Sequence, residues 1–124
     1  DTIIERKNKI FSLYKDLLAD IKEIKILTPN DKIDPHIPFR VVLTTEEKSE
    51  GLMKFMGDNG IETRTFFYPL HRQPCMKQFS QNDKLLKNSV YAYEHGVCLP
   101  SYVALETEQI EYVCSIIKKY YEKN

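Results

Sequence analysis

Residues 38–67 read PFRVVLTTEEKSEGLMKFMGDNGIETRTFF and contain a strand, a helix and a second strand in succession. Between Pro38 and Thr44, apolar side chains alternate with other side chains. This period of two predicts a strand with one well-buried face, and Pro38 suits the start or the edge of such a strand. The predicted buried face carries Phe39, Val41 and Leu43.

A helix is predicted to follow over residues 46–59. Thr44 and Glu47 form a T-x-x-E capping box, which is typical of a helix start. Gly60 suits the position just after the helix end, because glycine adopts the left-handed backbone conformation at little cost. The β-branched and aromatic residues of 61–67 then predict a second strand. The apolar face of the helix carries Leu52, Phe55 and Met56.

An amphipathic helix is predicted over residues 1–22, because apolar side chains recur there at spacings of three, four and seven. A possible short strand follows at residues 24–27. The proline, asparagine and aspartate residues of 28–35 favour turns and predict an exposed loop. The apolar positions of the helix are Ile3, Ile10, Tyr14, Leu17, Leu18 and Ile21.

The second half of the chain begins with a segment whose composition fits neither a helix nor a strand. Residues 68–74 contain two prolines, a histidine and an arginine, which predicts an irregular segment of defined shape. Residues 75–95 lean towards helix, residues 96–100 predict a short buried strand, and Thr107 is suited to cap a last helix. Together these patterns predict one α+β domain over residues 1–124, a small, mostly antiparallel sheet of three to four strands covered by helices.

Composition limits the classes of function. Lys and Arg number 18, as do Asp and Glu, so the formal net charge is zero, and the charges are spread along the chain. No nucleic-acid partner is therefore expected. No apolar run approaches the ~20 residues that span a bilayer, and the observed start carries no signal-peptide pattern, so no membrane association is expected. Three widely spaced cysteines predict buried thiols in a reducing cytoplasm. They are Cys75, Cys98 and Cys114.

The sequence contains no complete catalytic or metal-binding constellation. Its four glycines form neither a G-x-G-x-x-G motif nor a P-loop, and there is no G-x-S-x-G motif. The three histidines lack the spacing of metal ligands, and the paired glutamates lie at predicted helix starts, where they complement the helix dipole. We interpret His36 as a loop residue and His95 as a cationic residue at a helix end. His71 lies in the irregular segment, where a structural histidine held by local hydrogen bonds is the alternative to a functional one.

A longer motif is present at residues 60–74, which read GIETRTFFYPLHRQP. They resemble the G-I-x-T-R-x-x-x-x-P-L-H-x-Q-P segment of the DegT/DnrJ/EryC1/StrS aminotransferases. Residues 97–101 and 105–113 are similar to the closing pattern of that family, L-P and then L-T-x-E-Q-I-x-x-V, in the same order and spacing. The N-terminal helix is similar to the helix that links the large and small domains of the family, with its R-x7-Y-x2-L pattern. The residues that carry this last similarity are Arg6, Tyr14 and Leu17.

The resemblance implies that the chain is the C-terminal small domain of a fold-type I enzyme. Residues 1–22 would be the interdomain helix and residues 23–124 the α+β body. Such an enzyme uses pyridoxal phosphate to move an amino group from glutamate to a keto sugar carried on a nucleotide. In the family, the Schiff-base lysine and the cofactor site belong to the large domain, which precedes residue 1. We therefore expect no catalytic and no cofactor-binding residue in this chain, no activity from the chain alone, and a homodimeric full-length protein.

The same resemblance predicts a contribution to substrate binding, because the P-L-H region of the family helps to wall the sugar pocket. The expected wall is formed by Phe67, Tyr68 and Leu70. The expected polar groups are His71 with Arg64 or Gln73. Two other interpretations stay open: a free-standing α+β ligand-binding or regulatory module, and the small domain of a different fold-type I enzyme, which would not need the P-L-H segment.

Overall fold

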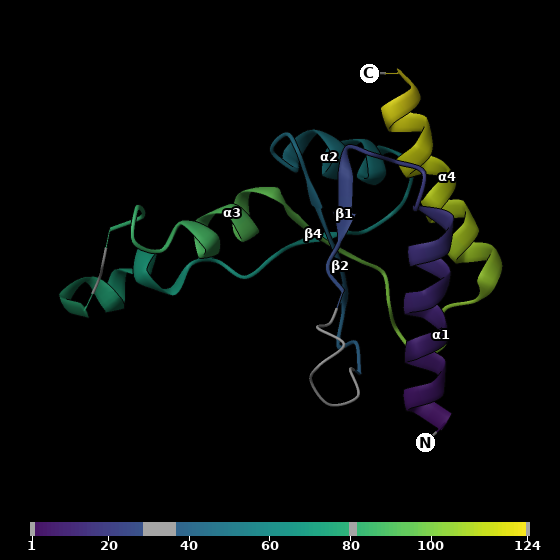
Figure 1. The fold of residues 1–124 in the computed structure, drawn as a ribbon, viewed down its shortest axis with the longest axis horizontal. Helices are drawn as coiled ribbons and strands as arrows, with labels where there is room; N and C mark the ends of the chain where they lie inside the picture. Colours follow the sequence, from purple (N-terminus) through teal and green to yellow (C-terminus); the bar gives the residue numbers. More distant parts are fainter. Residues whose placement is uncertain (1, 29–36, 80–81, 124) are drawn as a thin grey trace.

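The computed structural model of the chain describes residues 2–28, 37–79 and 82–123. In this described part, a four-stranded antiparallel sheet runs in the order β1-β2-β4-β3. Helices α1 and α4 lie together on one side of the sheet, α2 packs against α4, and α3 extends on the other side (Figure 1). This arrangement confirms the predicted α+β fold. The elements are α1 (Thr2–Leu17), β1 (Ile24–Ile26), β2 (Val41–Thr45), α2 (Glu50–Asp58), β3 (Arg64–Thr65), the 3-10 helices η1 (Leu70–Arg72) and η2 (Pro74–Phe79), α3 (Lys87–His95), β4 (Gly96–Leu99) and α4 (Thr107–Lys123).

The central strand β2 is buried on both faces. All of its residues are buried, and it pairs with β1 along one edge and with β4 along the other, so that Leu43 lies opposite Ile26 and Val97. Helix α3, on the far side of the sheet from α1 and α4, contacts both β2 and β4. The prediction of a single well-buried face is therefore wrong, because the chain returns across the second face. Phe39, expected on the buried face, precedes the strand and is 73% exposed.

Helix α2 begins at Glu50, later than predicted. Thr44 belongs to β2, where its hydroxyl donates to the carbonyl oxygen of Lys25 at 3.4 Å. The predicted capping box is wrong, because β2 continues past Thr44 and takes that residue into the sheet. Ser49 precedes the helix and its hydroxyl donates to the carbonyl oxygen of Glu94 at 3.1 Å. The start of α2 is thereby joined to α3 instead of being capped by its own flanking residues.

The end of α2 is confirmed as predicted. Gly60 has a φ of +78°, which lies in the left-handed region that favours glycine. The N–H of Gly60 donates to the carbonyl oxygen of Gly57, and the N–H of Ile61 donates to that of Met56, both at 3.0 Å. This pair of hydrogen bonds is a Schellman motif, and the buried side chains of Met56 and Ile61 supply the apolar contact that accompanies it. The motif turns the chain from α2 towards β3.

Helix α1 packs its C-terminal half into the core and ends at Leu17, earlier than predicted. Ile10 and Tyr14 are buried, whereas Ile3 is 63% exposed, so the first turns of the helix extend beyond the core. The hydroxyl of Tyr14 donates to the carbonyl oxygen of Pro100 at 2.9 Å. Burial raises the pKa of Tyr14 above its ordinary value. This residue therefore links the helix to the segment that follows β4.

Three other predicted elements differ from those observed. The strand predicted over residues 61–67 is limited to β3, and residues 75–95 divide between η2 and α3. Thr107 is the first residue of α4 and not its cap. The side chain of Gln109 instead accepts a hydrogen bond from the backbone N–H of Glu106 at 2.9 Å, as the third residue of a helix does in a capping box.

The loop predicted over residues 28–35 and the predicted loop residue His36 lie, apart from Thr28, outside the described residues. Among the helices that the structure describes, none has the length and apolar content needed to cross a membrane.

Candidate functional site

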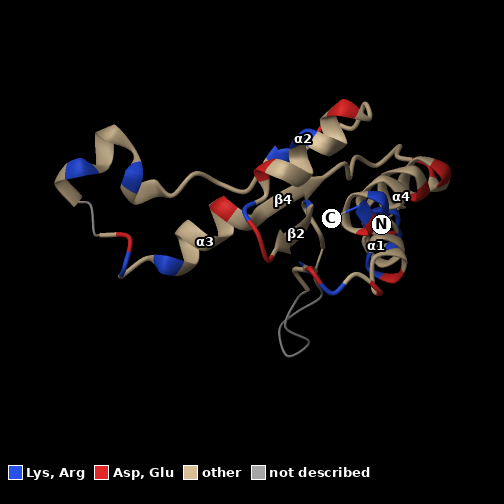
Figure 2. Ribbon diagram, turned by 90° about the horizontal axis from the view of Figure 1, so that it is seen from above, with Lys and Arg blue, Asp and Glu red and all other residues tan. Residues whose placement is uncertain are grey.

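The P-L-H segment forms part of an arm, defined as residues 66–79 and 82–95, which leaves the sheet after β3 and returns to it as β4 (Figure 1). The arm contains η1, η2 and α3. Its return is tightly fixed at Gly96, where a Cβ atom would lie 2.2 Å from the carbonyl oxygen of Ala92 and 2.8 Å from the Cβ of Phe66. Basic and acidic residues are interspersed on the arm and on the helices across the sheet (Figure 2).

A cluster of charged side chains joins the two halves of the arm. His71 on η1 lies with Nε2 2.7 Å from Oδ1 of Asp83, and the side chain of His71 is only 7% exposed. Arg72 donates to the same carboxylate twice, from Nε to Oδ1 at 3.1 Å and from Nη2 to Oδ2 at 2.7 Å. Nη1 of Arg72 also lies 3.7 Å from Oε1 of Glu94 on α3. The cluster therefore ties η1 to the segment before α3 and to α3 itself.

The charges in this cluster influence one another. Hydrogen bonds from Arg72 and then from His71 lower the pKa of Asp83 to about 2, so its carboxylate is ionised at neutral pH. The hydrogen bond to Asp83 in turn raises the pKa of Arg72. Such bidentate contacts between a guanidinium and a carboxylate fix geometry more firmly than a single ion pair does.

The predicted wall residues are apolar side chains that face outward. Phe67 is 63% exposed and Leu70 is 65% exposed. Tyr68 is half exposed and meets Tyr93 edge to face, with 5.1 Å between the ring centroids. The guanidinium of Arg40 lies 5.7 Å from the ring centroid of Phe67. The structure thus presents these rings on the surface of the arm, where they are available to a second body.

The two predicted polar companions of His71 lie at different places. Gln73 follows η1 on the arm, is partly buried, and donates its backbone N–H to the carbonyl oxygen of Leu70 at 3.0 Å. Arg64 lies on β3, where its Nη2 is 3.4 Å from Oε1 of Glu62. The arm therefore carries His71, Gln73 and the aromatic residues, whereas Arg64 belongs to a separate hollow on the sheet.

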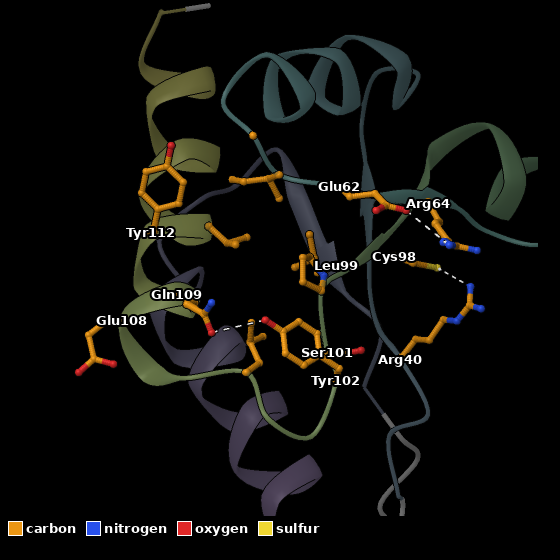
Figure 3. A pocket seen from close by; sticks show the side chains of 15 residues that line it. Arg40, Glu62, Arg64, Cys98, Leu99, Ser101, Tyr102, Glu108, Gln109 and Tyr112 are labelled. Carbon is orange, nitrogen blue, oxygen red and sulfur yellow. Dashed lines mark hydrogen bonds and ion pairs between the residues drawn. The ribbon is translucent and has the colours of Figure 1, made fainter.

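This hollow has a volume of about 760 Å³ and lies between β4, the segment before β3, and the first turns of α4 (Figure 3). Figure 3 shows Arg40 and Arg64 on one side of it with Cys98 between them, and Nη1 of Arg40 lies 4.0 Å from the Cys98 sulfur. On the other side, the hydroxyl of Tyr112 donates to the carbonyl oxygen of Asn59 at 3.0 Å. The apolar lining residues are Ile61, Leu99, Pro100, Leu105 and Val113. An apolar floor beside two guanidinium groups suits binding rather than catalysis.

Helix α1 holds the loop that forms one border of the hollow. Arg6 donates from Nε to the carbonyl oxygen of Val103 at 3.1 Å and from Nη2 to that of Leu105 at 3.0 Å. Lys7 donates to the carbonyl oxygens of Phe39 at 2.9 Å and Ser101 at 2.7 Å, and partial burial lowers its pKa. These bonds give structural roles to two basic residues of the N-terminal helix.

Sequence reasoning missed Asp83 and Arg40. Asp83 is twelve residues from His71 in a weakly patterned segment, and no spacing rule connects the two positions. Arg40 lies next to an apolar strand, where its part in the hollow depends on how β3 folds back beside β4. In the described part of the chain, no group of three or more His, Cys, Asp or Glu side chains gathers to hold a metal ion.

The sequence profile of the DegT/DnrJ/EryC1/StrS aminotransferase family matches residues 1–118. The chain belongs to this family. Among curated relatives, it is 29% identical to a GDP-perosamine synthase from Vibrio cholerae over 123 residues and 28% identical to one from Escherichia coli O157:H7 over 121 residues. These alignments cover 98% of the chain but 33% and 32% of the relatives. The family member described here thus spans about a third of the length of the curated relatives it matches.

Solved structures of family members agree in fold. A putative sugar aminotransferase, Spr1654 from Streptococcus pneumoniae, superposes with a TM-score of 0.85 at 18% identity, over 98% of this chain and 31% of its own. DesV from S. venezuelae superposes with a TM-score of 0.86 at 22% identity, over 95% of this chain and 32% of its own. At these identities, the likeness supports the aminotransferase fold, and the arm is part of the region it covers.

Proposed function

We propose that residues 1–124 form the C-terminal small domain of a pyridoxal-phosphate-dependent nucleotide-sugar aminotransferase, and that the arm helps to form its sugar pocket. The observation that carries this proposal is the arm itself. The P-L-H segment projects from the sheet, exposes aromatic and aliphatic side chains, and holds His71 on a fixed carboxylate. The family match over residues 1–118 favours this function over a free-standing ligand-binding module.

The names of two relatives and the family resemblance support the choice of substrates to test. Two relatives are named GDP-perosamine synthases, so a GDP-linked keto sugar is the first acceptor to test. Glutamate is proposed as the donor on the family resemblance alone. We infer that the full-length protein is a homodimer that acts in the cytoplasm. Buried Cys98 and Cys114 together with an exposed free Cys75 suit a reducing compartment.

The hollow does not fit pyridoxal phosphate. A phosphorylated pyridine cofactor needs a free lysine and an anion-binding cradle. No lysine lines the hollow, and the guanidinium group of Arg64 at its edge faces Glu62. We therefore assign the cofactor to the part of the protein that corresponds to the remaining two thirds of the relatives. No step of the reaction is assigned to a lysine of residues 1–124.

In the proposed enzyme, this chain binds and orients the sugar. Pockets form preferentially between domains and combine apolar walls with a few placed polar groups. Phe67, Tyr68 and Leu70 supply apolar surface, and Gln73 is the neighbouring amide. His71 supplies a hydrogen bond to a hydroxyl of the sugar. Arg64 lies at the hollow on β3 and is proposed to interact with another part of the substrate or of the protein.

The test is the substitution His71→Ala in the full-length protein. Loss of one hydrogen bond in a water-excluded site is worth about 1–3 kcal/mol, so kcat/KM for the keto sugar should fall roughly 5- to 150-fold. Lys84→Ala is the matched control, because Lys84 is an exposed residue on the same arm. An unchanged kcat/KM in the His71 variant would remove this residue from the site.

A second experiment tests the division of labour. Residues 1–124 alone, mixed with pyridoxal phosphate, glutamate and a GDP-linked keto sugar, are expected to transfer no amino group. Visible absorbance of a bound cofactor, at one equivalent for each chain, would contradict the assignment of the cofactor to the rest of the protein.

A further inference from the structure

The side chain that faces His71 has no role in the function proposed so far. Asp83 lies in the segment between η2 and α3, and its Oδ1 is 2.7 Å from Nε2 of His71. Because the side chain of His71 is almost fully covered, the ring has little room to turn. The orientation of the imidazole is thus set by a residue from the opposite half of the arm.

The contact with Asp83 also sets which ring nitrogen carries the proton. An ionised carboxylate only accepts hydrogen bonds, so Nε2 of His71 must be the donor. In the neutral ring, Nδ1 is then an acceptor. The hydrogen bond that the structure describes for His71 uses Nε2, and Nδ1 is left for a group that donates, such as a hydroxyl.

Arg72 holds the carboxylate of Asp83 in place beside His71. Its Nε and Nη2 donate to Oδ1 and Oδ2 of Asp83, so both carboxylate oxygens are held, and Oδ1 is shared with His71. Its Nη1 lies 3.7 Å from Oε1 of Glu94. The positive charge of Arg72 offsets the negative charge of the Asp83 carboxylate. Asp83 can therefore orient His71 without leaving an uncompensated negative charge on the arm.

We propose that Asp83 is a positioning residue that holds His71 as the Nε2–H tautomer and thereby presents Nδ1 as the acceptor for a hydroxyl of the sugar. This proposal rests on the proposed function for the identity of the ligand. Its structural half, the tautomer fixed by Asp83, is independent of that function.

The substitution Asp83→Leu separates orientation from simple packing, because leucine is close to aspartate in shape and accepts no hydrogen bond. Asparagine would not serve, because Oδ1 accepts from both His71 and Nε of Arg72, so its amide oxygen could stay towards His71. In Asp83→Leu, no acceptor holds the proton on Nε2, and both tautomers of the neutral ring become accessible. The variant should retain the fold, because the side chain of Asp83 is half exposed, but it should no longer hold Nδ1 as the acceptor for the sugar hydroxyl.

The first measurement is the tautomer itself, in the full-length protein with 15N-labelled histidine. Imidazole 15N chemical shifts at a pH where the ring is neutral should show the proton on Nε2 of His71 in the wild type and a mixture of both tautomers in Asp83→Leu. A wild-type ring protonated on Nδ1, or a tautomer that the substitution leaves unchanged, would overturn the inference.

The second measurement separates the two half-reactions, followed by the change in cofactor absorbance. In Asp83→Leu, kcat/KM of the keto-sugar half-reaction should fall roughly 5- to 150-fold, as estimated for a lost hydrogen bond. The glutamate half-reaction should change less than two-fold, and Asp83→Glu should restore part of the sugar rate. Lys84→Gln serves as the control on the arm. An equal fall in both half-reactions would mean a merely structural role and would overturn the inference.

The two proposals fail in different ways. If His71→Ala lowers the sugar half-reaction and Asp83→Leu does not, the positioning role is refuted and the function of His71 stands. If neither variant changes that half-reaction, His71 is not a sugar ligand and the functional half of the inference is refuted with it. The 15N measurement still decides whether Asp83 fixes the tautomer.

Discussion

The substitution Gly60→Ala tests the motif that directs the chain from α2 into β3. Gly60 has a φ of +78°, and a Cβ atom there would meet no other atom within 4 Å, so any cost comes from the backbone conformation alone. A left-handed conformation costs an L-residue about 1–2 kcal/mol. Alanine also lowers the entropy of the unfolded chain, which returns about 0.4–1 kcal/mol only where the native conformation is compatible. We therefore expect a loss of about 1–2 kcal/mol in the free energy of unfolding.

Gly57→Ala is the matched control, because Gly57 lies in the last turn of α2, just before Gly60, and a Cβ atom there also meets nothing within 4 Å. Its φ is not positive, so alanine is expected to raise the free energy of unfolding by about 0.5–1 kcal/mol. Urea unfolding followed by circular dichroism measures both variants, and the slope with urea should be unchanged. For a domain of this size, 1 kcal/mol corresponds to a Tm shift of roughly 3–6 °C. Equal effects of the two substitutions would refute the conformational argument.

Further predictions concern Gly96 and the three cysteines. Gly96→Ala should abolish cooperative unfolding of residues 1–124 or greatly lower their Tm, because the new methyl group would lie 2.2 Å from the backbone oxygen of Ala92, which cannot move without breaking α3. Exposed Cys75 should react rapidly with a thiol reagent such as DTNB in the native protein, whereas buried Cys98 and Cys114 should react only after unfolding. Rapid labelling of all three thiols at pH 8 would contradict the burial of Cys98 and Cys114. Burial also raises the pKa of Cys114 to about 12. The contribution of Cys114 to the free energy of unfolding is therefore complete below the ordinary thiol pKa near 9 and declines as the pH rises towards 12.

Those parts of the fold that depend on local patterns were predictable. The apolar spacing of α1 and α4 and the glycine after α2 identify these elements, because amphipathic periodicity and a positive φ act within a few residues. The burial of β2 on both faces was not predictable. It depends on α3, which lies some fifty residues further along the chain and returns across the sheet. The capping box failed for a related reason, since Thr44 matches both a helix cap and a strand, and pairing with Lys25 decides for the strand.

The site was predicted by resemblance rather than by physics. The P-L-H motif identified His71, but composition and spacing alone left a structural histidine equally open. Asp83, which determines what His71 can do, had no signal in the sequence, because it is brought to His71 by the fold of the arm. Arg64 was grouped with His71 because the two are close in sequence. The structure places Arg64 on β3 instead, beside Arg40, which approaches the hollow from the start of β2.

The arm carries several exposed apolar side chains, and its charged cluster holds them in place. Phe67, Leu70, Phe79 and Leu85 are all exposed, and burying an apolar side chain of this size is worth about 1.5–3 kcal/mol. An arm that gains this energy only by packing against a second body must keep its shape before it does so. His71 and Arg72 of η1 hydrogen-bond to Asp83, and Arg72 forms an ion pair with Glu94 of α3. These contacts hold the shape of the arm without a hydrophobic core. In the proposed enzyme, the cluster therefore has two roles: it preorganises an apolar surface for the sugar pocket, and it fixes the hydrogen-bonding direction of His71 on that surface.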